Sequence, residues 1–386
     1  MKILHISPSA PYNDYWGYQE NILPKYHKKL GHDVTLIITN LTQKDGKWVE
    51  TDCADYVLND GVRVIRKSKK KYFSKIYSSL CSRLDIYKEL VELRPDFIFY
   101  HGLVSTTIFD VIKYKKKINP NCVIVQDNHL DYNIGFKYKG VKRLLIKTFY
   151  WILNRRSIRY VDRVFGVTPW RKKYAQDFFG IPAEKTGVLI MGADDEKIDF
   201  ENRETIRKSI RDKYSIKDDD FLIVTGGKID SKKKIHLLME ACSGLPRVTL
   251  IVFGSVQDDV KKSFYDILGS SDNIYYIGWI DADSVYDYFF AADLAFFPGQ
   301  HSVLWEQACA SKIPCIFEKW EGMDHVNNGG NSAFIEDVTV ESLKERVLSL
   351  VNTPEYEKMK AAAESDKTDI YLYSNIAKKS IEIAEK

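Results

Sequence analysis

Two lysines in a glycine-containing turn, Gly226–Lys234, are the first residues whose types and spacing suggest chemistry. The apolar run Phe221–Thr225 before the turn is typical of a strand, and Ile235–Ala241 after it is typical of a helix. Lys228 and Lys233 are therefore expected at a strand end, where their ammonium groups can bind a diphosphate. Lysine runs are as often solvated surface, so the turn alone does not decide between the two interpretations.

A second turn, Phe296–Gly299, leads into a predicted helix that contains Glu306. Free amides at a helix start favour an anion, so His301, Ser302 and Val303 are candidate phosphate-binding residues. Glu306 lies about one turn into the helix, where its carboxylate can accept two hydrogen bonds from a vicinal diol such as ribose. An exposed helix glutamate is the alternative, but the apolar neighbours of Glu306 argue against it.

The first half of the chain has two comparable segments. Gly17 lies between the predicted strand Lys2–Ile6 and a predicted helix, where backbone amides can approach a phosphate or a sugar. Gln126–His129 ends another predicted strand, so Asp127 and His129 are catalytic candidates, and His129 can bond a sugar hydroxyl or a leaving phosphate. A turn glycine and a structural histidine are the ordinary alternatives. The fingerprint G-x-G-x-x-G is absent from the first turn, which argues against an NAD- or FAD-dependent oxidoreductase.

Strands and helices that alternate along the chain must position these residues. Short apolar runs alternate with amphipathic stretches from Lys2 to Val167, and the pattern restarts at Phe221. Each half therefore predicts an α/β fold with a doubly wound parallel sheet, and 386 residues suit two such domains. The polar stretch Gly192–Ile210 predicts the boundary. We expect domains at 1–195 and 196–365, with the C-terminal helix 366–386 joining the first.

Charge and hydropathy narrow the possible partners. A net charge of +4 does not indicate nucleic-acid binding, and 45% hydrophobic residues indicate a globular chain. Positive charge is concentrated in Arg63–Lys75 and Lys137–Arg159, which are either solvated surface or a face turned toward anionic lipid or a phosphate-bearing acceptor. Leu144–Leu153 is shorter than a membrane span and is flanked by basic residues, so it predicts either an interfacial or a buried helix.

The cysteines and the opening segment bear on location. The six cysteines lack metal-site spacing and are expected to be buried, reduced thiols. Met1–Ile6 is too short for the apolar part of a signal peptide. The expected location is therefore the cytoplasm.

In their order and spacing, these segments resemble the retaining family 4 glycosyltransferases of the GT-B fold over nearly the whole chain. Gly227–Lys233 resembles the family's G-R-L-x-x-x-K, with Lys228 in place of arginine, and Trp305–Ala308 stands where the family has L-E-A. The other segments similar to family motifs are Leu30–Thr35, Arg94–Asp96, Met191–Asp194, Ile277–Trp279, Ala291–Asp293 and Pro298–Gly299.

The resemblance implies two Rossmann-like domains facing across a cleft. It implies sugar transfer, with retention, from a nucleoside diphosphate sugar to a glycan or lipid-linked acceptor in cell-surface polysaccharide or glycoconjugate synthesis. It assigns Lys228 and Lys233 to the donor diphosphate and Glu306 to the ribose. His129 takes the place of the family's active-site histidine, with Asp127 as the alternative. No cofactor or metal ion is expected, and with the basic stretches a peripheral place at the inner face of the cell membrane is expected.

The chain departs from the family at one position. The family has a glutamate pair E-x(7)-E; Glu306 fits the second, but Pro298 stands at the first. Gln300 or His301 are candidates to read the donor sugar instead. A nucleotide-sugar epimerase of the same fold and a degenerate, non-catalytic sugar-binding subunit therefore remain alternatives.

Overall fold

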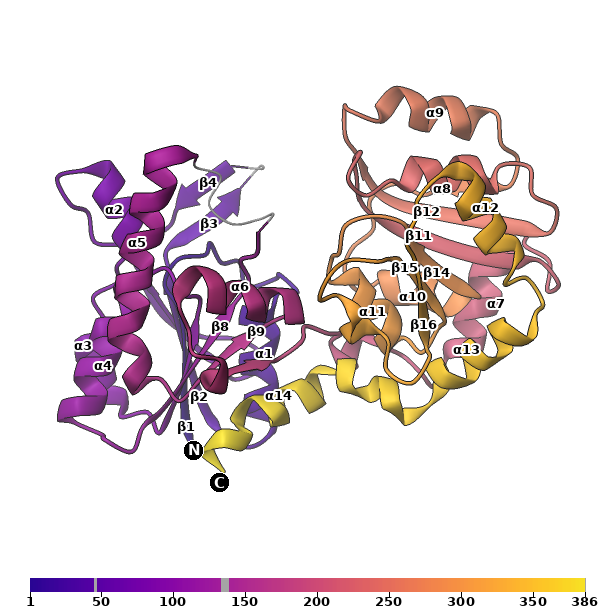
Figure 1. The fold of residues 1–386 in the computed structure, drawn as a ribbon. Helices are drawn as coiled ribbons and strands as arrows, with labels where there is room; N and C mark the ends of the chain where they lie inside the picture. Colours follow the sequence, from indigo (N-terminus) through magenta and orange to yellow (C-terminus); the bar gives the residue numbers. More distant parts are fainter. Residues whose placement is uncertain (45–46, 133–138, 386) are drawn as a thin grey trace. The chain divides into compact units, whose positions relative to one another are not determined.

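The computed structural model describes residues 1–44, 47–132 and 139–385, which form two compact units (Figure 1). The first comprises Met1–Ile190 with Ile376–Lys386, and the second comprises Met191–Asn375. The basic stretch predicted from Lys137 begins with two residues outside the described ones, Lys137 and Tyr138.

The unit boundaries differ from the expected positions 195 and 366. Ala193 forms a bridge with Leu372, and its amide donates to the carbonyl of Tyr371 at 2.8 Å, so both segments belong to the second unit. The C-terminal stretch is also not one helix. Asp366–Tyr371 is a 3-10 helix, and α14 follows at Tyr373–Ile381.

The first unit is built on a sheet with the strand order β10-β9-β8-β7-β1-β2-β6-β5, in which only the β5–β6 pair is antiparallel. Because β2 and β7 flank β1 on opposite sides, the strand order reverses beside β1. The strands are β1 Lys2–Ser7, β2 Asp33–Thr39, β5 Ala54–Val57, β6 Arg63–Lys67, β7 Phe97–His101, β8 Val123–Asn128, β9 Arg163–Gly166 and β10 Thr186–Val188, and a separate hairpin pairs β3 Leu41–Lys44 with β4 Lys47–Glu50.

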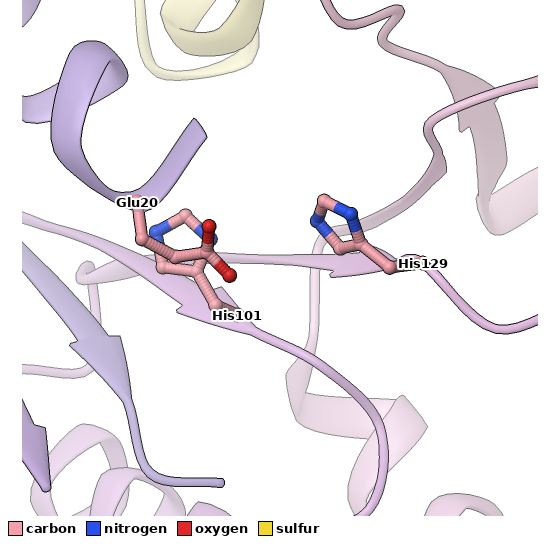
Figure 2. Close-up of side chains that lie close together, drawn as sticks. All are labelled: Glu20, His101 and His129. Carbon is pink, nitrogen blue, oxygen red and sulfur yellow. The ribbon is translucent and has the colours of Figure 1, made fainter. Parts of the chain in front are cut away.

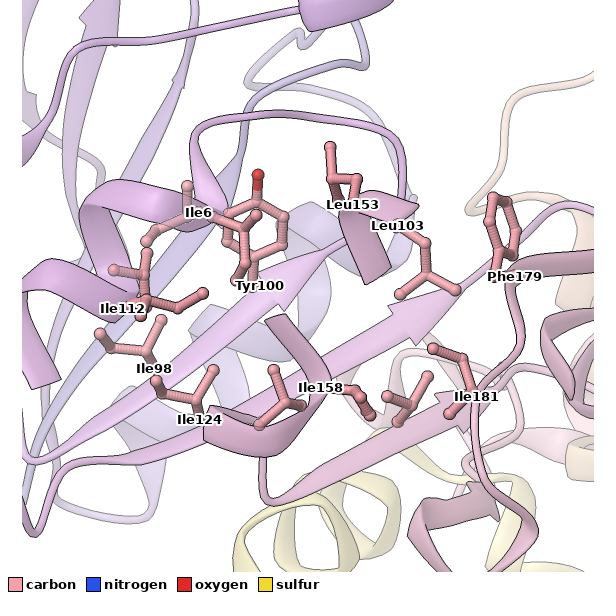
Figure 3. Close-up of a cluster of buried hydrophobic side chains, with 14 of the residues drawn as sticks. Ile6, Ile98, Tyr100, Leu103, Ile112, Ile124, Leu153, Ile158, Phe179 and Ile181 are labelled. Atoms are coloured by element: carbon pink, nitrogen blue, oxygen red, sulfur yellow. The ribbon is translucent and has the colours of Figure 1, made fainter. Parts of the chain in front are cut away.

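Helices cover this sheet and enclose its core. The strand side chains Ile98, Tyr100 and Ile124 pack against Ile112 of α4 and Leu153 of α5 (Figure 3). Central parallel strands are buried on both faces, which accounts for their continuous apolar runs. The helices are α1 Gln19–Lys29, α2 Lys75–Cys81, α3 Tyr87–Leu93, α4 Ile108–Lys117, α5 Gly140–Ser157 and α6 Pro169–Phe179.

The second unit has a six-stranded parallel sheet with the order β13-β12-β11-β14-β15-β16. Its strands are β11 Phe221–Ile229, β12 Val248–Val256, β13 Ile274–Tyr276, β14 Leu294–Phe297, β15 Cys315–Glu318 and β16 Ser332–Ile335. Its helices are α7 Arg203–Lys213, α8 Ile235–Cys242, α9 Lys261–Gly269, α10 Val285–Ala291, α11 Leu304–Ala310, α12 Val340–Leu348 and α13 Pro354–Glu364. The prediction of two doubly wound α/β domains is confirmed.

Three details refine the sequence analysis. β11 continues to Ile229, so Lys228 lies in the strand and the turn starts after it. All six cysteines are free, but Cys53 is exposed, whereas the other five are buried. Across the described ranges, no helix combines the length and apolarity that crossing a membrane requires.

Candidate active site

In the second unit, the turns after β11 and β14 pack against each other at the point where the strand order reverses. Such switch points are where open α/β sheets bind ligands. The amide of Gln300 donates to the carbonyl of Lys232 at 3.1 Å. A Cβ on Gly299 would lie 2.4 Å from the carbonyl carbon of Lys233, so only glycine allows this approach. The fold therefore brings together the two donor-site segments that the sequence placed about seventy residues apart.

Glu306 is fully buried in the first turn of α11. Its Oε1 accepts hydrogen bonds from Nε2 of both His301 and His325, each at 2.8 Å. Burial alone would raise the pKa of Glu306, but the two imidazoles hold it at about 2, so the side chain is anionic. Within the described residues, Oε2 has no hydrogen-bond partner. One oxygen is thus fixed by two imidazoles, and the other is buried with no hydrogen-bond partner among the described residues.

His325 is a site residue that the sequence analysis missed. It lies in the short 3-10 helix Asp324–Val326 between β15 and β16, and its carbonyl accepts a hydrogen bond from the Tyr371 hydroxyl at 2.7 Å. The segment before it has no apolar periodicity that would assign it to a strand end. The only signal in the sequence was the residue type itself, and a lone histidine more often has a structural role than a binding role.

The two lysines have different surroundings. Lys233 donates from Nζ to the backbone carbonyls of Gln300 and His301, the latter at 3.1 Å, and burial lowers its pKa to about 8. Lys228 has a side chain that is 61% exposed and lies 3.4 Å from Asp230. Lys233 therefore holds the turn that precedes α11, whereas Lys228 presents its charge to solvent.

The remaining second-unit candidates surround Glu306. Ser302 and Val303 are half-buried and immediately precede α11. His301 directs Nε2 at Glu306, and Gln300 contributes its carbonyl to Lys233. Pro298, at the first glutamate position of the family pattern, is part of the turn after β14.

In the first unit, Asp127 and His129 lie at the end of β8, as predicted. Asp127 is fully buried, and its Oδ2 accepts from His101 Nδ1 at 2.8 Å and from His129 Nε2 at 3.2 Å. The Gly102 amide donates to Oδ1 at 2.8 Å. Although burial opposes ionisation, the two imidazoles hold the pKa of Asp127 below its usual range. Asp127 is thus an orienting group, and the partly exposed His129 is the one that a ligand can reach.

The anionic Asp127 ends a chain of buried histidines that the sequence analysis did not connect. His101 Nε2 lies 3.1 Å from His5 Nδ1, and His5 Nε2 lies 2.9 Å from His27 Nδ1. His27 Nε2 then contacts Ser380 Oγ at 2.7 Å. Because the ionised Asp127 only accepts, His101 donates to it from Nδ1, and at the other end His27 Nε2 also lies 3.3 Å from the carbonyl of Ala377. Strand and helix positions far apart in sequence join here, so no local pattern reveals the chain.

Two groups of side chains could hold a metal ion. Glu20, His101 and His129 converge beside the end of β8 (Figure 2), and His301, Glu306 and His325 converge in the second unit. In the first group His101 Nδ1 and His129 Nε2 bond to Asp127, and in the second group Nε2 of His301 and of His325 bond to Glu306.

Gly17 lies in the exposed turn after β1, directly before the N-cap residue Tyr18 of α1. It therefore shares with Asp127 and His129 the edge of the sheet where parallel strands end. This is the edge that binds ligands in open α/β folds.

Each unit thus has a largely parallel sheet with polar groups at its strand ends, the place where open α/β sheets bind ligands. Residues 23–197 match the model for Glycosyltransferase Family 4, and residues 206–366 match the model for Glycosyl transferases group 1. The chain therefore matches a glycosyltransferase domain model in each half, and the two matches together cover most of its length.

Similar proteins agree with these matches. A 240-residue alignment to an uncharacterized glycosyltransferase of Methanocaldococcus jannaschii has 22% identity and covers 57% of this chain and 59% of that relative. A glycosyltransferase from Rickettsia africae has a similar structure, with 17% identity, a TM-score of 0.69, and coverage of 100% of this chain and 99% of that one. Anabaena HepE in complex with UDP-glucose has 16% identity, a TM-score of 0.66 and the same coverage. At these identities, the structural likeness shows the fold.

Proposed function

We propose that the protein transfers a sugar from a nucleoside diphosphate sugar to a glycan or lipid-linked acceptor in cell-surface polysaccharide or glycoconjugate synthesis. The observation that carries the proposal is Glu306, an anionic and fully buried carboxylate with one unpartnered oxygen at the strand switch point. A buried charge is costly unless it is paired, and an unpaired oxygen there is best explained by a ligand that donates to it. The ribose of a nucleotide has such hydroxyls.

Each candidate then has a task in the transfer. Lys228, with Lys233, stabilises the charge that develops on the leaving diphosphate, because positioned cations act most strongly where charge appears. His129, oriented by Asp127, faces the reacting sugar hydroxyls in the first unit. Retention of configuration and the cytoplasmic location follow from the family resemblance and are part of the proposal.

Product analysis tests the proposal. The protein is incubated with UDP-, GDP- and ADP-sugars and a lipid extract, with and without a chelator. We expect one donor to release its nucleoside diphosphate with the sugar attached to an acceptor, and the same rate in chelator, because the lysines carry the charge that a metal would otherwise neutralise.

Other products would favour the alternatives. A changed sugar still attached to its nucleotide would indicate an epimerase. Binding of a donor without turnover in any extract would indicate a non-catalytic sugar-binding subunit. Loss of transfer in chelator, restored by a divalent ion, would contradict the metal-independent mechanism.

Substitutions of the two lysines should show which of them only binds the donor and which also stabilises the turn. Lys228→Ala should weaken donor binding about tenfold to hundredfold, because a charged hydrogen bond is worth about 1.5–3 kcal/mol. Lys233→Ala should weaken binding and also lower the melting temperature, because the carbonyls of Gln300 and His301 lose their donor. The exposed Lys232→Ala is the matched control and should change neither. Unchanged kinetics in both variants would remove the lysines from the site.

Donor affinity should depend on pH through Lys233, whose pKa is about 8 before the donor binds. As pH rises through 8, the ammonium loses its proton and the diphosphate loses a partner, so affinity should fall between about pH 7 and pH 9. Lys233→Arg should flatten this dependence, since arginine keeps its charge. A dependence that is the same in the arginine variant would assign the titration to another group.

A further inference from the structure

The inner side of α5 is a conventional core face. Ile146, Tyr150 and Leu153 are buried against the sheet, and Asn154 Nδ2 donates to the carbonyl of Leu103 at 3.0 Å. Their spacing of three and four residues places them on one stripe of the helix. This stripe accounts for the docking of α5 on the first unit.

The outer side of the same helix is also apolar. Val141, Leu144 and Leu145 are 73%, 63% and 65% exposed, and Ile152 is 40% exposed. These residues form a second stripe at the same spacing, on the side of the helix opposite the buried one. A helix surrounded by water carries polar residues there, so this outer stripe lacks a partner within the described chain.

A second exposed apolar group belongs to the neighbouring α2. Ile76 and Tyr77 at the start of α2 are 67% and 50% exposed, and Phe73, two residues before α2, is 114% exposed. α2 packs against α5, since the Tyr150 hydroxyl donates to the carbonyl of Leu80 at 2.9 Å (Figure 1). We call Phe73, Ile76, Tyr77, Val141, Leu144 and Leu145 the α2–α5 face.

The segments that carry the α2–α5 face are basic, although before α2 Lys70 pairs with Asp85 and Lys71 pairs with Glu50. No acidic residue occurs in α5, and none occurs between Gly61 and Leu84. The basic residues of α5 are Lys142, Arg143, Lys147, Arg155 and Arg156. Exposed large apolar side chains among basic residues on a helical surface fit the interface of an anionic bilayer, which takes up both kinds of side chain.

The topology places this face near the candidate catalytic residues. α5 follows β8 and precedes the parallel β9, so its first turns lie at the edge where β8 ends with Asp127. α2 follows β6 and precedes β7, and these two parallel strands flank the pair β1 and β2 in the sheet. Because α2 comes after the end of β6, it starts at the same edge. His129 is at the same edge of the sheet.

We propose that the α2–α5 face docks the first unit on an anionic lipid bilayer, with Val141, Leu144 and Leu145 inserted at the interface. The face then holds the strand-end edge of this unit near a lipid-linked acceptor. This last role rests on the proposed function, whereas the docking itself does not.

Vesicle co-sedimentation of the full chain tests the docking. The probes are phosphatidylcholine vesicles with and without about a third of phosphatidylglycerol. We expect binding to the anionic vesicles that weakens with salt. Leu144→Ser with Leu145→Ser should weaken it by about tenfold or more, because their apolar area stays in water. Lys142→Gln with Arg143→Gln should weaken it by about fivefold per charge.

Matched controls are available in the second unit. Lys261→Gln with Lys262→Gln removes two exposed charges from α9, and Trp279→Ser removes an exposed aromatic side chain that is 74% exposed. Both should bind vesicles as the unaltered protein does. Circular dichroism melting should be unchanged in all variants, because the altered residues are exposed.

Equal vesicle binding by the leucine variant and the unaltered protein would overturn the proposal. So would sedimentation showing a dimer that the leucine variant converts to a monomer while vesicle binding persists, because a second copy would then be the occupant. Donor binding measured without vesicles separates this inference from the proposed function. Failure to bind any nucleotide sugar would count against the function alone.

Discussion

Glu306→Gln lowers donor affinity by about tenfold to hundredfold. The amide keeps the shape of the carboxylate, and its oxygen can still accept from His301 and His325. The group that replaces Oε2, however, is an NH2 that donates and cannot accept from a ribose hydroxyl. Losing a charge-assisted bond to a buried group costs about 1.5–3 kcal/mol, which gives the expected range. Titration calorimetry of the donor measures it.

A donor with 2′-deoxyribose sharpens this test. The unaltered protein should bind the deoxy donor more weakly than the ribose donor, and Glu306→Gln should discriminate less. Glu318→Gln is the matched control, because Glu318 is also buried in the second unit, with Oε1 paired to Lys234 and Oε2 unpartnered, but it ends β15 and does not belong to α11. It should keep the discrimination. Equal discrimination by the unaltered protein and Glu306→Gln would place the ribose elsewhere.

The same substitution should also affect stability. The pKa of Glu306 is lowered from 4.5 to about 2, so ionisation stabilises the folded state by about 3 kcal/mol at neutral pH. That contribution is present above about pH 4.5 and is lost as pH falls through about 2. Glu306→Gln removes the charge, so its melting temperature should be lower at pH 7, and binding should be measured well below it.

His129→Ala lowers kcat by about a hundredfold to ten-thousandfold with little change in donor affinity. General acid–base catalysis contributes rate factors of that size, and His129 belongs to the first unit, whereas the groups assigned to the nucleotide belong to the second. Steady-state kinetics should therefore show a change in kcat rather than in KM. His32→Ala, which alters a half-buried histidine outside the chain that ends at Asp127, is the control and should keep full activity. Full activity of His129→Ala would return His129 to a structural role.

Asp127→Asn should shift the pH profile. Burial lowers the pKa of His129, but the charge of Asp127 outweighs it and raises the pKa. Without that charge, His129 should lose its proton at a lower pH, so the acidic limb of the kcat profile should move to lower pH. A limb that stays in place would show that another group sets it.

Much of the fold followed from local patterns. Apolar runs such as Phe221–Thr225 and turns rich in glycine located the strands and the two sheets, because buried parallel strands need continuous apolar side chains. The expected boundary at residue 195 and the unit boundary at Ile190 differ because the bridge between Ala193 and Leu372 joins segments that no local pattern connects.

The candidate site was predicted only in part. Lys228 and Asp127 lie in the last residues of strands and Glu306 lies in the first turn of a helix, so their positions could be inferred from these elements. His325 and His5 could not, because one lies in an irregular segment and the other inside a strand, and each acquires its partner only through the sheet order. The hydrogen bonds from Lys233 Nζ to the backbone carbonyls of Gln300 and His301 also depend on the close packing of the two turns at Gly299. A sequence does not reveal this packing.

Titration of UDP, GDP and ADP into the protein tests the central claim most directly, because it asks whether the site around Glu306 reads a nucleoside diphosphate. We predict that one of the three binds with a Kd below about 1 mM, or about −4 kcal/mol, and that Glu306→Gln binds it at least tenfold more weakly. No binding of any of the three at millimolar concentration, or equally tight binding by Glu306→Gln, would contradict the account.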